Sequence, residues 1–218
     1  ANVGVLTVAA VETINITLDD SDTTAATVMY DLNMDAANAT SFVVTGDAGI
    51  TFANGTQAAL TSMDASGVTA TGAAGVVTFT ANAAMNTAIT GGAGNDVLTG
   101  NSGNDTIIGG AGTNTLVGGA GNDTITGGAG IEDITGGTGV DTMTGGGAVD
   151  TFIFGTADSG YTITTIDSIT DFNTGGSDII DLAAADNVAG ASAAGTTNAT
   201  TDVAVAVGGK VTFAAADD

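Results

Sequence analysis

Acidic side chains recur at a fixed spacing of nine residues through the middle of this chain. The residues at this spacing are Asp96, Asp105, Asn114, Asp123, Glu132, Asp141 and Asp150. A carboxylate repeated at one position supplies hard, anionic oxygen, the ligand type that calcium prefers. The chain has neither cysteine nor histidine, which excludes thiolate or imidazole metal sites and every nucleophilic triad that needs these residues. Cation binding by oxygen ligands is therefore the chemistry that the pattern favours.

The acidic positions lie within seven consecutive nonapeptides that run from Gly91 to Ile153. The units read GGAGNDVLT, GNSGNDTII, GGAGTNTLV, GGAGNDTIT, GGAGIEDIT, GGTGVDTMT and GGGAVDTFI. Positions one to four are almost all glycine or another small residue, and position eight is always apolar. The position-eight residues are Leu98, Ile107, Leu116, Ile125, Ile134, Met143 and Phe152. This alternation predicts a tight turn followed by a very short strand.

One apolar side chain per unit can be buried only where successive units stack and turn it inward. We therefore predict a flattened coil of parallel strands with two units to each turn. Position-six residues then form two ladders, one along each edge, with like charges about 4.8 Å apart. Such a ladder is repulsive unless a cation lies between its rungs, and calcium fits that gap beside the carbonyls of glycine turns. A glycine-rich linker that binds nothing is the alternative, but linkers lack an aliphatic residue at a fixed offset.

The composition narrows the function in the same direction. Lys210 is the only basic residue against 24 Asp and Glu, and the formal net charge is −23. Nucleic acid and anionic membrane are therefore poor partners, because both require Lys and Arg to neutralise phosphate. We find no pattern of a cleavable signal and no run near the roughly 18 apolar residues that a membrane helix requires. The chain begins at Ala1, so we expect it to be a segment of a longer protein.

The nonapeptides resemble the RTX, or hemolysin-type, calcium-binding repeat, whose pattern is GGxGxDxUx with U a large aliphatic residue. The resemblance covers Gly91 to Ile153. It implies that several calcium ions are each held by the position-two and position-four carbonyls and the position-six carboxylate of one turn. The position-one and position-three carbonyls and the position-six group of the turn eighteen residues later complete each site. The resemblance also implies export by type I machinery.

On the edge that contains Asp105, Asp123 and Asp141, the resemblance implies two intact sites. The first uses Asn101, Gly103 and Asp105 with Gly118, Ala120 and Asp123. The second uses Gly119, Gly121 and Asp123 with Gly136, Thr138 and Asp141. By the same resemblance, Asp158 and Asp167 complete a last site with Gly137, Gly139 and Asp141. The alternative for this last group is a capping hairpin with solvated aspartates.

The opposite edge departs from the family pattern at two rungs. The residues implied there are Gly92, Gly94, Asp96, Gly109, Ala111, Asn114, Glu132 and Asp150. Asn114 lacks a charge, and Glu132 is one methylene longer than aspartate. Because ligand charge tunes calcium affinity, we predict that these sites are weaker or empty and that the Asp105 edge fills at lower calcium.

Residues 1–90 do not follow the nonapeptide pattern but show a looser recurrence. The segments VETINIT, ATSFVVT, LTSMDAS and NTAITGG align Ile14, Phe42, Met63 and Ile89, at spacings of 28, 21 and 26 residues. This range suits the coils of a wider parallel β-helix with bulging loops such as 18–24, and an antiparallel sandwich is the alternative. We therefore expect an all-β chain: a right-handed parallel β-helix over 1–90, an RTX parallel β-roll over 91–153, and a C-terminal strand cap with a tail over 154–218.

The segment from Asp150 to Leu182 contains bulky residues that we expect to close the stack, namely Phe152, Ile153 and Phe154. The patterns DSITDF and GSDIIDL resemble the strand-rich cap that follows the roll in RTX proteases. The Thr- and Ala-rich tail 183–218 fits either an edge strand pair or a loop.

The order of these segments also resembles the C-terminal part of calcium-dependent surface-layer (S-layer) proteins of Gram-negative bacteria. This resemblance implies an extracellular structural protein of the cell surface, not an enzyme, that self-associates into a lattice once calcium drives its folding. A cell-surface polysaccharide is a further candidate partner. The alternatives are an adhesin and the non-catalytic calcium roll of a secreted protease or lipase, although neither HExxH nor GxSxG occurs in this chain.

Overall fold

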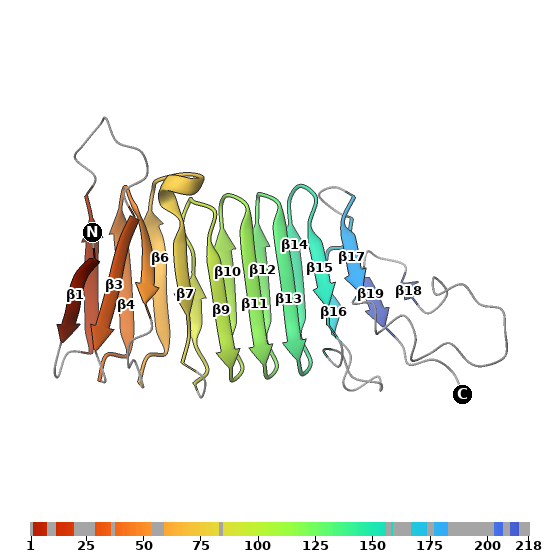
Figure 1. The fold of residues 1–218 in the computed structure, drawn as a ribbon. Helices are drawn as coiled ribbons and strands as arrows, with labels where there is room; N and C mark the ends of the chain where they lie inside the picture. The colour runs from red at the N-terminus through yellow and green to blue at the C-terminus, as the bar shows by residue number, and fades with distance from the viewer. Residues whose placement is uncertain are drawn as a thin grey trace.

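In the computed structural model, most of the described residues form strands that lie side by side along the molecule (Figure 1). The described residues are 2–7, 12–19, 29–35, 38–53, 59–82, 85–155, 158, 167–173, 177–182, 203–206 and 210–213. Within this part of the chain, the one helical segment is the 3-10 turn η1 (Ala73–Gly75). No helix in the described ranges is long and apolar enough to cross a membrane.

The chain alternates between two sheets, so that odd-numbered strands up to β17 form one sheet and even-numbered strands form the other. The nine-stranded sheet contains β1 (Asn2–Thr7), β3 (Met29–Asp35), β5 (Gly49–Ala53), β7 (Val77–Thr80), β9 (Val97–Ser102), β11 (Asn114–Ala120), β13 (Glu132–Thr138), β15 (Thr151–Phe154) and β17 (Ile179–Leu182). The ten-stranded sheet contains β2 (Thr13–Leu18), β4 (Ser41–Gly46), β6 (Ser62–Val68), β8 (Ala88–Thr90), β10 (Thr106–Gly110), β12 (Thr124–Gly128), β14 (Thr142–Gly146), β16 (Ser168–Ile169), β19 (Lys210–Phe213) and β18 (Val203–Ala206). Both sheets pair in parallel except at β19, which is antiparallel to β16 and β18. The fold is thus a parallel β-helix that continues into a β-roll, as predicted.

Residues eighteen apart stack on one another through the roll, because two nonapeptides make one turn. Ile107 pairs with Ile125, and Ile125 pairs with Met143 in the next strand. Every position-eight side chain from Leu98 to Phe152 is 0% exposed. The predicted inward row of aliphatic residues is confirmed, and these side chains form the thin core between the two sheets.

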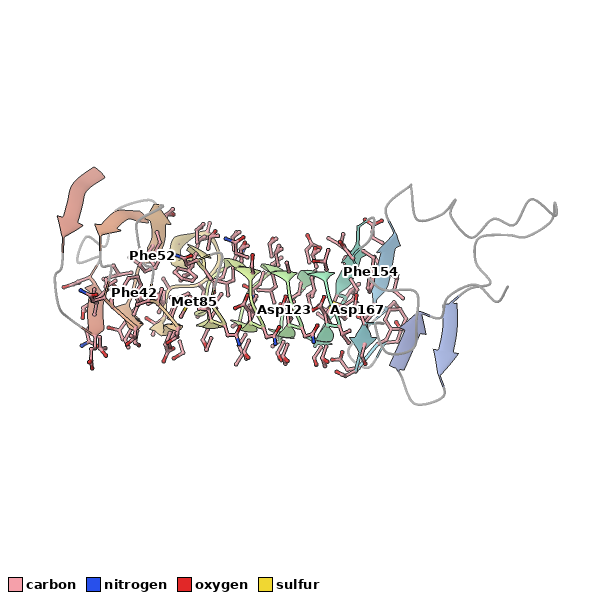
Figure 2. All side chains as sticks on the ribbon, turned by 90° about the horizontal axis from the view of Figure 1, so that it is seen from below. Phe42, Phe52, Met85, Asp123, Phe154 and Asp167 are labelled. Atoms are coloured by element: carbon pink, nitrogen blue, oxygen red, sulfur yellow. The ribbon has the colours of Figure 1, made fainter. Side chains whose placement is uncertain are left out.

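The looser recurrence in the first ninety residues is also confirmed. Ile14 pairs with Phe42, Phe42 with Met63, and Met63 with Ile89, all in parallel, which excludes the antiparallel sandwich. Ile89 then pairs with Ile107, so the wider coils and the roll share the same sheets. The wider coils hold larger side chains, including Phe42 and Phe52, whose stacked rings lie 5.5 Å apart between centroids (Figure 2). The predicted bulge at 18–24 lies largely outside the described residues.

The stack does not end at the aromatic residues after the roll. Strand β15 pairs with β17 and β14 pairs with β16, which adds one further coil. Phe152 and Phe154 face the core, but Ile153 is only partly buried because alternate residues of a strand point to opposite faces. The prediction that Phe152, Ile153 and Phe154 close the stack is therefore wrong, because a further coil follows them and Ile153 does not face the core. Of the two alternatives for the tail, the strand pair is the one observed in its described residues, 203–206 and 210–213, as β18 and β19.

Candidate calcium site

Four aspartates form a buried ladder along one edge of the roll, which we call the Asp105 edge. The rungs are Asp105, Asp123, Asp141 and Asp167, and each is at most 2% exposed. Each rung is joined to the next because its backbone N–H donates to the following Oδ1. These N–H···O distances are 2.7 Å from Asp105 to Asp123, 2.8 Å from Asp123 to Asp141 and 2.9 Å from Asp141 to Asp167. Figure 2 looks onto this edge, with Asp123 and Asp167 labelled.

The second oxygen of these carboxylates faces a space that glycine keeps open. Oδ2 of Asp105, Asp123 and Asp141 is buried and accepts no hydrogen bond. A Cβ atom on Gly118 would lie less than 3.0 Å from both Asp123 Oδ2 and Gly136 O, and Gly100 shows the same arrangement with Asp105 Oδ2 and Gly118 O. Each gap therefore gathers a carboxylate oxygen and a carbonyl oxygen from successive turns, and position one must be glycine to leave it room.

Backbone carbonyls would supply the remaining ligands of a cation in these gaps. Within the described ranges, no three acidic side chains converge on one point. Asn101 O approaches Gly119, and Gly103 O approaches Gly121, where the backbone has φ values of 117° and 131° that favour glycine. The carbonyls of Ala120 and Thr138 already accept N–H groups at 2.8 Å, so each has one lone pair left for a metal. A donor set made wholly of oxygen, part of it anionic, fits calcium.

The carboxylates of the Asp105 edge are costly to ionise without a cation. Burial, opposed by the N–H of Thr87 and assisted by the Asp123 carboxylate, raises the pKa of Asp105 to about 6. Burial, with nearby acidic groups that include Asp167 and Asp158, raises the pKa of Asp141 to about 7. Burial also raises the pKa of Asp123. A cation in the gaps would supply the compensation that the folded chain lacks.

We expect the calcium-free chain to gain β structure when the pH is lowered from about 8 to about 5. The pKa rises to about 6 in Asp105 and about 7 in Asp141 on folding, so the folded chain binds protons that the unfolded chain releases. This stabilisation is complete below the ordinary carboxyl pKa of about 4 and is lost as the pH rises through about 6 to 7. Far-UV circular dichroism in chelator across this range measures it. Greater β content at pH 8 than at pH 5 would contradict the expectation.

The opposite edge, which we call the Asp96 edge, satisfies its polar groups internally at Asp96 and Asn114, whereas Oε2 of Glu132 is buried and accepts no hydrogen bond. Both oxygens of Asp96 accept hydrogen bonds, from Val77 N–H at 2.8 Å and Gly92 N–H at 2.7 Å. Asn114 Oδ1 accepts the Asp96 N–H at 2.8 Å, and Asn114 Nδ2 donates to Glu132 Oε1 at 3.4 Å. A Cβ on Gly109 would meet this amide nitrogen, whereas on the other edge the corresponding glycines meet a carboxylate oxygen. The gap at Asn114 therefore presents a donor to any cation.

The other residues implied on the Asp96 edge lie on the same stacked turns. The carbonyl of Gly92 accepts the Ala111 N–H at 3.0 Å, and the carbonyl of Gly94 approaches Gly112. Glu132 N–H donates to Asp150 Oδ1 at 3.0 Å. Burial, followed by the neighbouring Asp150, raises the pKa of Glu132 to about 8. The Glu132 and Asp150 pair is thus another place where two buried carboxyl groups oppose each other.

We expect the substitution Asn114→Asp to add calcium binding on the Asp96 edge. The change replaces the amide donor beside Gly109 with a carboxylate oxygen and restores the charge that the family pattern has at this position. Isothermal titration calorimetry should then show at least one additional ion per chain. The same change at the exposed Asn122, which precedes Asp123, is the control and should leave the number of ions unchanged. An unaltered count in Asn114→Asp would contradict the predicted inequality of the edges.

The last implied site is brought together in part. Asp167 continues the ladder beyond Asp141, although 26 residues rather than 18 separate the two. Asp158 accepts a hydrogen bond from the N–H of Gly155 and is near enough to raise the pKa of Asp141. Gly137 and Gly139 approach the carbonyls of Gly119 and Gly121. The buried position of Asp167 argues against a hairpin in which both aspartates are solvated.

Some residues of the ladders do not follow from the nonapeptide pattern. Thr87, 2% exposed, donates its N–H to Asp105 Oδ1 at 2.7 Å and so takes the position of an aspartate one turn earlier. Thr87 lies eighteen residues before Asp105, which is one turn of the roll, so counting back by one turn would have located it. At the other end, Asp171 accepts the N–H groups of Gly145 and Gly146 at 3.0 and 2.8 Å. Asp178 accepts the N–H of Asp150 at 3.1 Å. Neither Asp171 nor Asp178 lies at a fixed spacing from the repeats, so the sequence pattern does not predict them.

Comparisons with known families agree with this geometry. Residues 90–125 match the model of the RTX calcium-binding nonapeptide repeat, and residues 110–194 match that of the Peptidase M10 serralysin C terminal. No curated protein and no solved structure gave a significant match. The two family matches indicate a calcium-binding protein of the type I-secreted class. The nonapeptide region of this chain is therefore a region of RTX calcium-binding repeats, which bind several calcium ions.

Proposed function

We propose that this chain is a structural protein of the bacterial cell surface, part of an S-layer or similar lattice, whose folding is driven by extracellular calcium. The observation that carries this proposal is the buried ladder of the Asp105 edge, in which Oδ2 of Asp105, Asp123 and Asp141 accepts no hydrogen bond. In a chain of formal charge −23, this ladder opposes folding where calcium is scarce and favours it where calcium is abundant. Export unfolded and folding outside the cell follow from that difference.

The continuity of the fold supports a structural role. The nine-stranded sheet runs from β1 to β17 and the ten-stranded sheet from β2 to β18, so the wide coils, the roll and the cap share one pair of sheets. A stack of this kind is an extended, regular body whose faces repeat at the strand spacing of about 4.8 Å. Such faces suit repeated contacts between subunits. The sequence resemblance to S-layer proteins points to the same role.

The second candidate is a non-catalytic calcium roll of a type I-secreted enzyme or adhesin. The match of residues 110–194 to the C-terminal region of serralysin favours it. In that case the chain would fold with calcium but would not assemble, because its task would be to support a domain elsewhere in the protein.

A calcium titration that starts in chelator separates these candidates. Circular dichroism follows β structure, and light scattering in the same samples follows assembly. We expect a cooperative gain of β structure at about 0.1–1 mM calcium, the range of extracellular modules, followed by growth of ordered assemblies. Folding without assembly would favour the detached roll. Folding that is unchanged in chelator would remove the calcium switch from both candidates.

A further inference from the structure

The outer face of the ten-stranded sheet carries two rows of small, mostly hydroxylated side chains from β2 to β16. The first row is Thr13, Ser41, Ser62, Ala88, Thr106, Thr124, Thr142 and Ser168. The second row is Asn15, Val43, Asp64, Thr90, Ile108, Thr126, Thr144 and Thr170. We call these two rows the hydroxyl face. It is continuous because each of its residues lies beside its counterpart on the next strand, although β4 and β6 shift register beyond Val43.

The hydroxyl face is nearly free of charge on a strongly acidic chain. Asp64 is its only acidic member, although the chain has 24 Asp and Glu and a single basic residue. The corresponding face of the nine-stranded sheet carries exposed Asp133 and Asp181. Exposed apolar residues lie on both faces, Val97 and Ile179 on that one and Ile108 on the hydroxyl face. Two copies of this chain repel each other through most of their surface. The hydroxyl face is where they can approach without opposing like charges.

Three threonine hydroxyls of the first row are available for an external partner, whereas Thr144 and Thr170 of the second row bond to each other at 2.7 Å. Thr106, Thr124 and Thr142 are exposed, and within the described part of the chain their hydroxyls make no hydrogen bond. Threonine is β-branched and holds few rotamers, so little side-chain entropy is lost when it is fixed. A second copy presents the same groups at the same strand spacing. The hydroxyl groups of two copies can therefore form hydrogen bonds along a whole row, provided that one copy is shifted against the other by a whole number of strand spacings.

We propose that the hydroxyl face binds the hydroxyl face of a second copy, which deepens the proposed lattice function and rests on it. The area decides how strong this contact is. Eight strands at about 4.8 Å make a face of roughly 34 by 12 Å, or about 400 Å² per copy. A stable pair typically buries about 800 Å² per partner. The contact is thus weak in isolation and holds only where many copies act together in an assembly.

Cross-linking tests the proposal, because the chain has no cysteine of its own. Single cysteines are placed on the hydroxyl face by Thr106→Cys, Thr124→Cys and Thr142→Cys, and these variants are mixed in pairs. The matched controls are Thr115→Cys and Thr151→Cys, at the same repeat position on the other sheet. A short bis-maleimide spans the distance of about 10 Å between sheets packed face to face. In saturating calcium, we expect dimers from at least one hydroxyl-face pair, several-fold more than from either control.

A charge variant provides the second measurement. Thr124→Asp places a carboxylate on the hydroxyl face. Thr115→Asp places one on the other sheet, where the neighbouring strand already has an aspartate, Asp133, at the same repeat position. We expect Thr124→Asp to reduce calcium-induced light scattering several-fold while Thr115→Asp leaves it close to the parent chain. Circular dichroism confirms that both variants fold.

The outcomes separate the two proposals. Assembly in calcium without cross-links on the hydroxyl face, or with equal cross-links on the control face, overturns the proposed contact and leaves the lattice function standing. A monomeric chain that binds a cell-surface polysaccharide through this face also overturns it. Absence of both assembly and cross-links in a calcium-folded chain removes the contact and the lattice function together.

Discussion

The substitution Asp123→Asn is expected to raise the calcium concentration at the folding midpoint by at least about tenfold. Asp123 lies between Asp105 and Asp141, so its carboxylate borders two gaps of the ladder. Asparagine keeps the side-chain oxygen that accepts the Asp105 N–H but removes the charge. A hydrogen bond or contact to a charged group contributes about 1.5–3 kcal/mol, and about 1.4 kcal/mol corresponds to a factor of ten.

The same substitution should act in the opposite direction when calcium is absent. Burial raises the pKa of Asp123, so the ionised carboxylate destabilises the calcium-free fold, and a neutral amide relieves this. Asn114 already shows an amide at the equivalent rung of the Asp96 edge. Thermal unfolding in chelator and in calcium measures both effects. If Asp123 had only a structural role, its substitution would lower the unfolding temperature both in chelator and in calcium.

Asp133→Asn is the matched control for Asp123→Asn. Asp133 lies at position seven, is exposed, and is outside both ladders. Its loss removes one negative charge without touching a gap, so the calcium midpoint should move by less than about twofold. Equal shifts in the two variants would show that net charge, rather than the ladder, governs calcium-dependent folding.

The substitution Gly118→Ala is expected to remove one calcium ion and to weaken folding in calcium. The Cβ would lie less than 3.0 Å from Asp123 Oδ2 and from Gly136 O, in the space where these two oxygens converge. The φ of Gly118 is not in the left-handed region, so alanine is not strained by its own dihedral angles and the effect comes from the close contacts of its Cβ with these two oxygens. Equilibrium dialysis counts the ions, and circular dichroism gives the calcium midpoint, which should rise at least about tenfold.

Gly147→Ala separates a filled gap from a general effect of replacing glycine. Gly147 is also in a turn of the roll, but a Cβ there would have its nearest neighbour at 3.4 Å, which is ordinary contact. This variant should bind as many ions as the parent chain and fold at a similar calcium concentration. If Gly118→Ala behaves in the same way as Gly147→Ala, the space beside Asp123 is not a calcium site.

The periodicity of the sequence predicts most of the fold, because equivalent residues of successive turns lie above one another in a parallel stack. Each aliphatic residue at position eight must lie above the one eighteen residues earlier, and so the alignment of the nonapeptides is also the register of the strands. The same reasoning held for Ile14, Phe42, Met63 and Ile89, although loops of different length separate them. Inward-facing side chains constrain the register, whereas loops can change length without disturbing it.

The ladder extends at both ends in ways that periodicity does not show. Thr87 has a hydroxyl where the pattern has a carboxylate, and it contributes through its backbone N–H, a group that every non-proline residue carries. Asp167 is reached after an insertion that breaks the eighteen-residue step. Backbone donors and residues beyond an insertion leave no periodic signal in a single sequence.

The sequence by itself determined the parallel coil, the inward aliphatic row, the acidic edges and the choice of calcium, because residue type and spacing alone decide which side chains can be buried and which charges must face each other. The tertiary structure decided which oxygens remain without a hydrogen bond. Both oxygens of Asp96 are satisfied, whereas Asp123 keeps one oxygen open, although the two aspartates occupy the same position of the repeat. That difference depends on which N–H groups a neighbouring turn brings within reach, and contacts between turns exist only once the chain has folded.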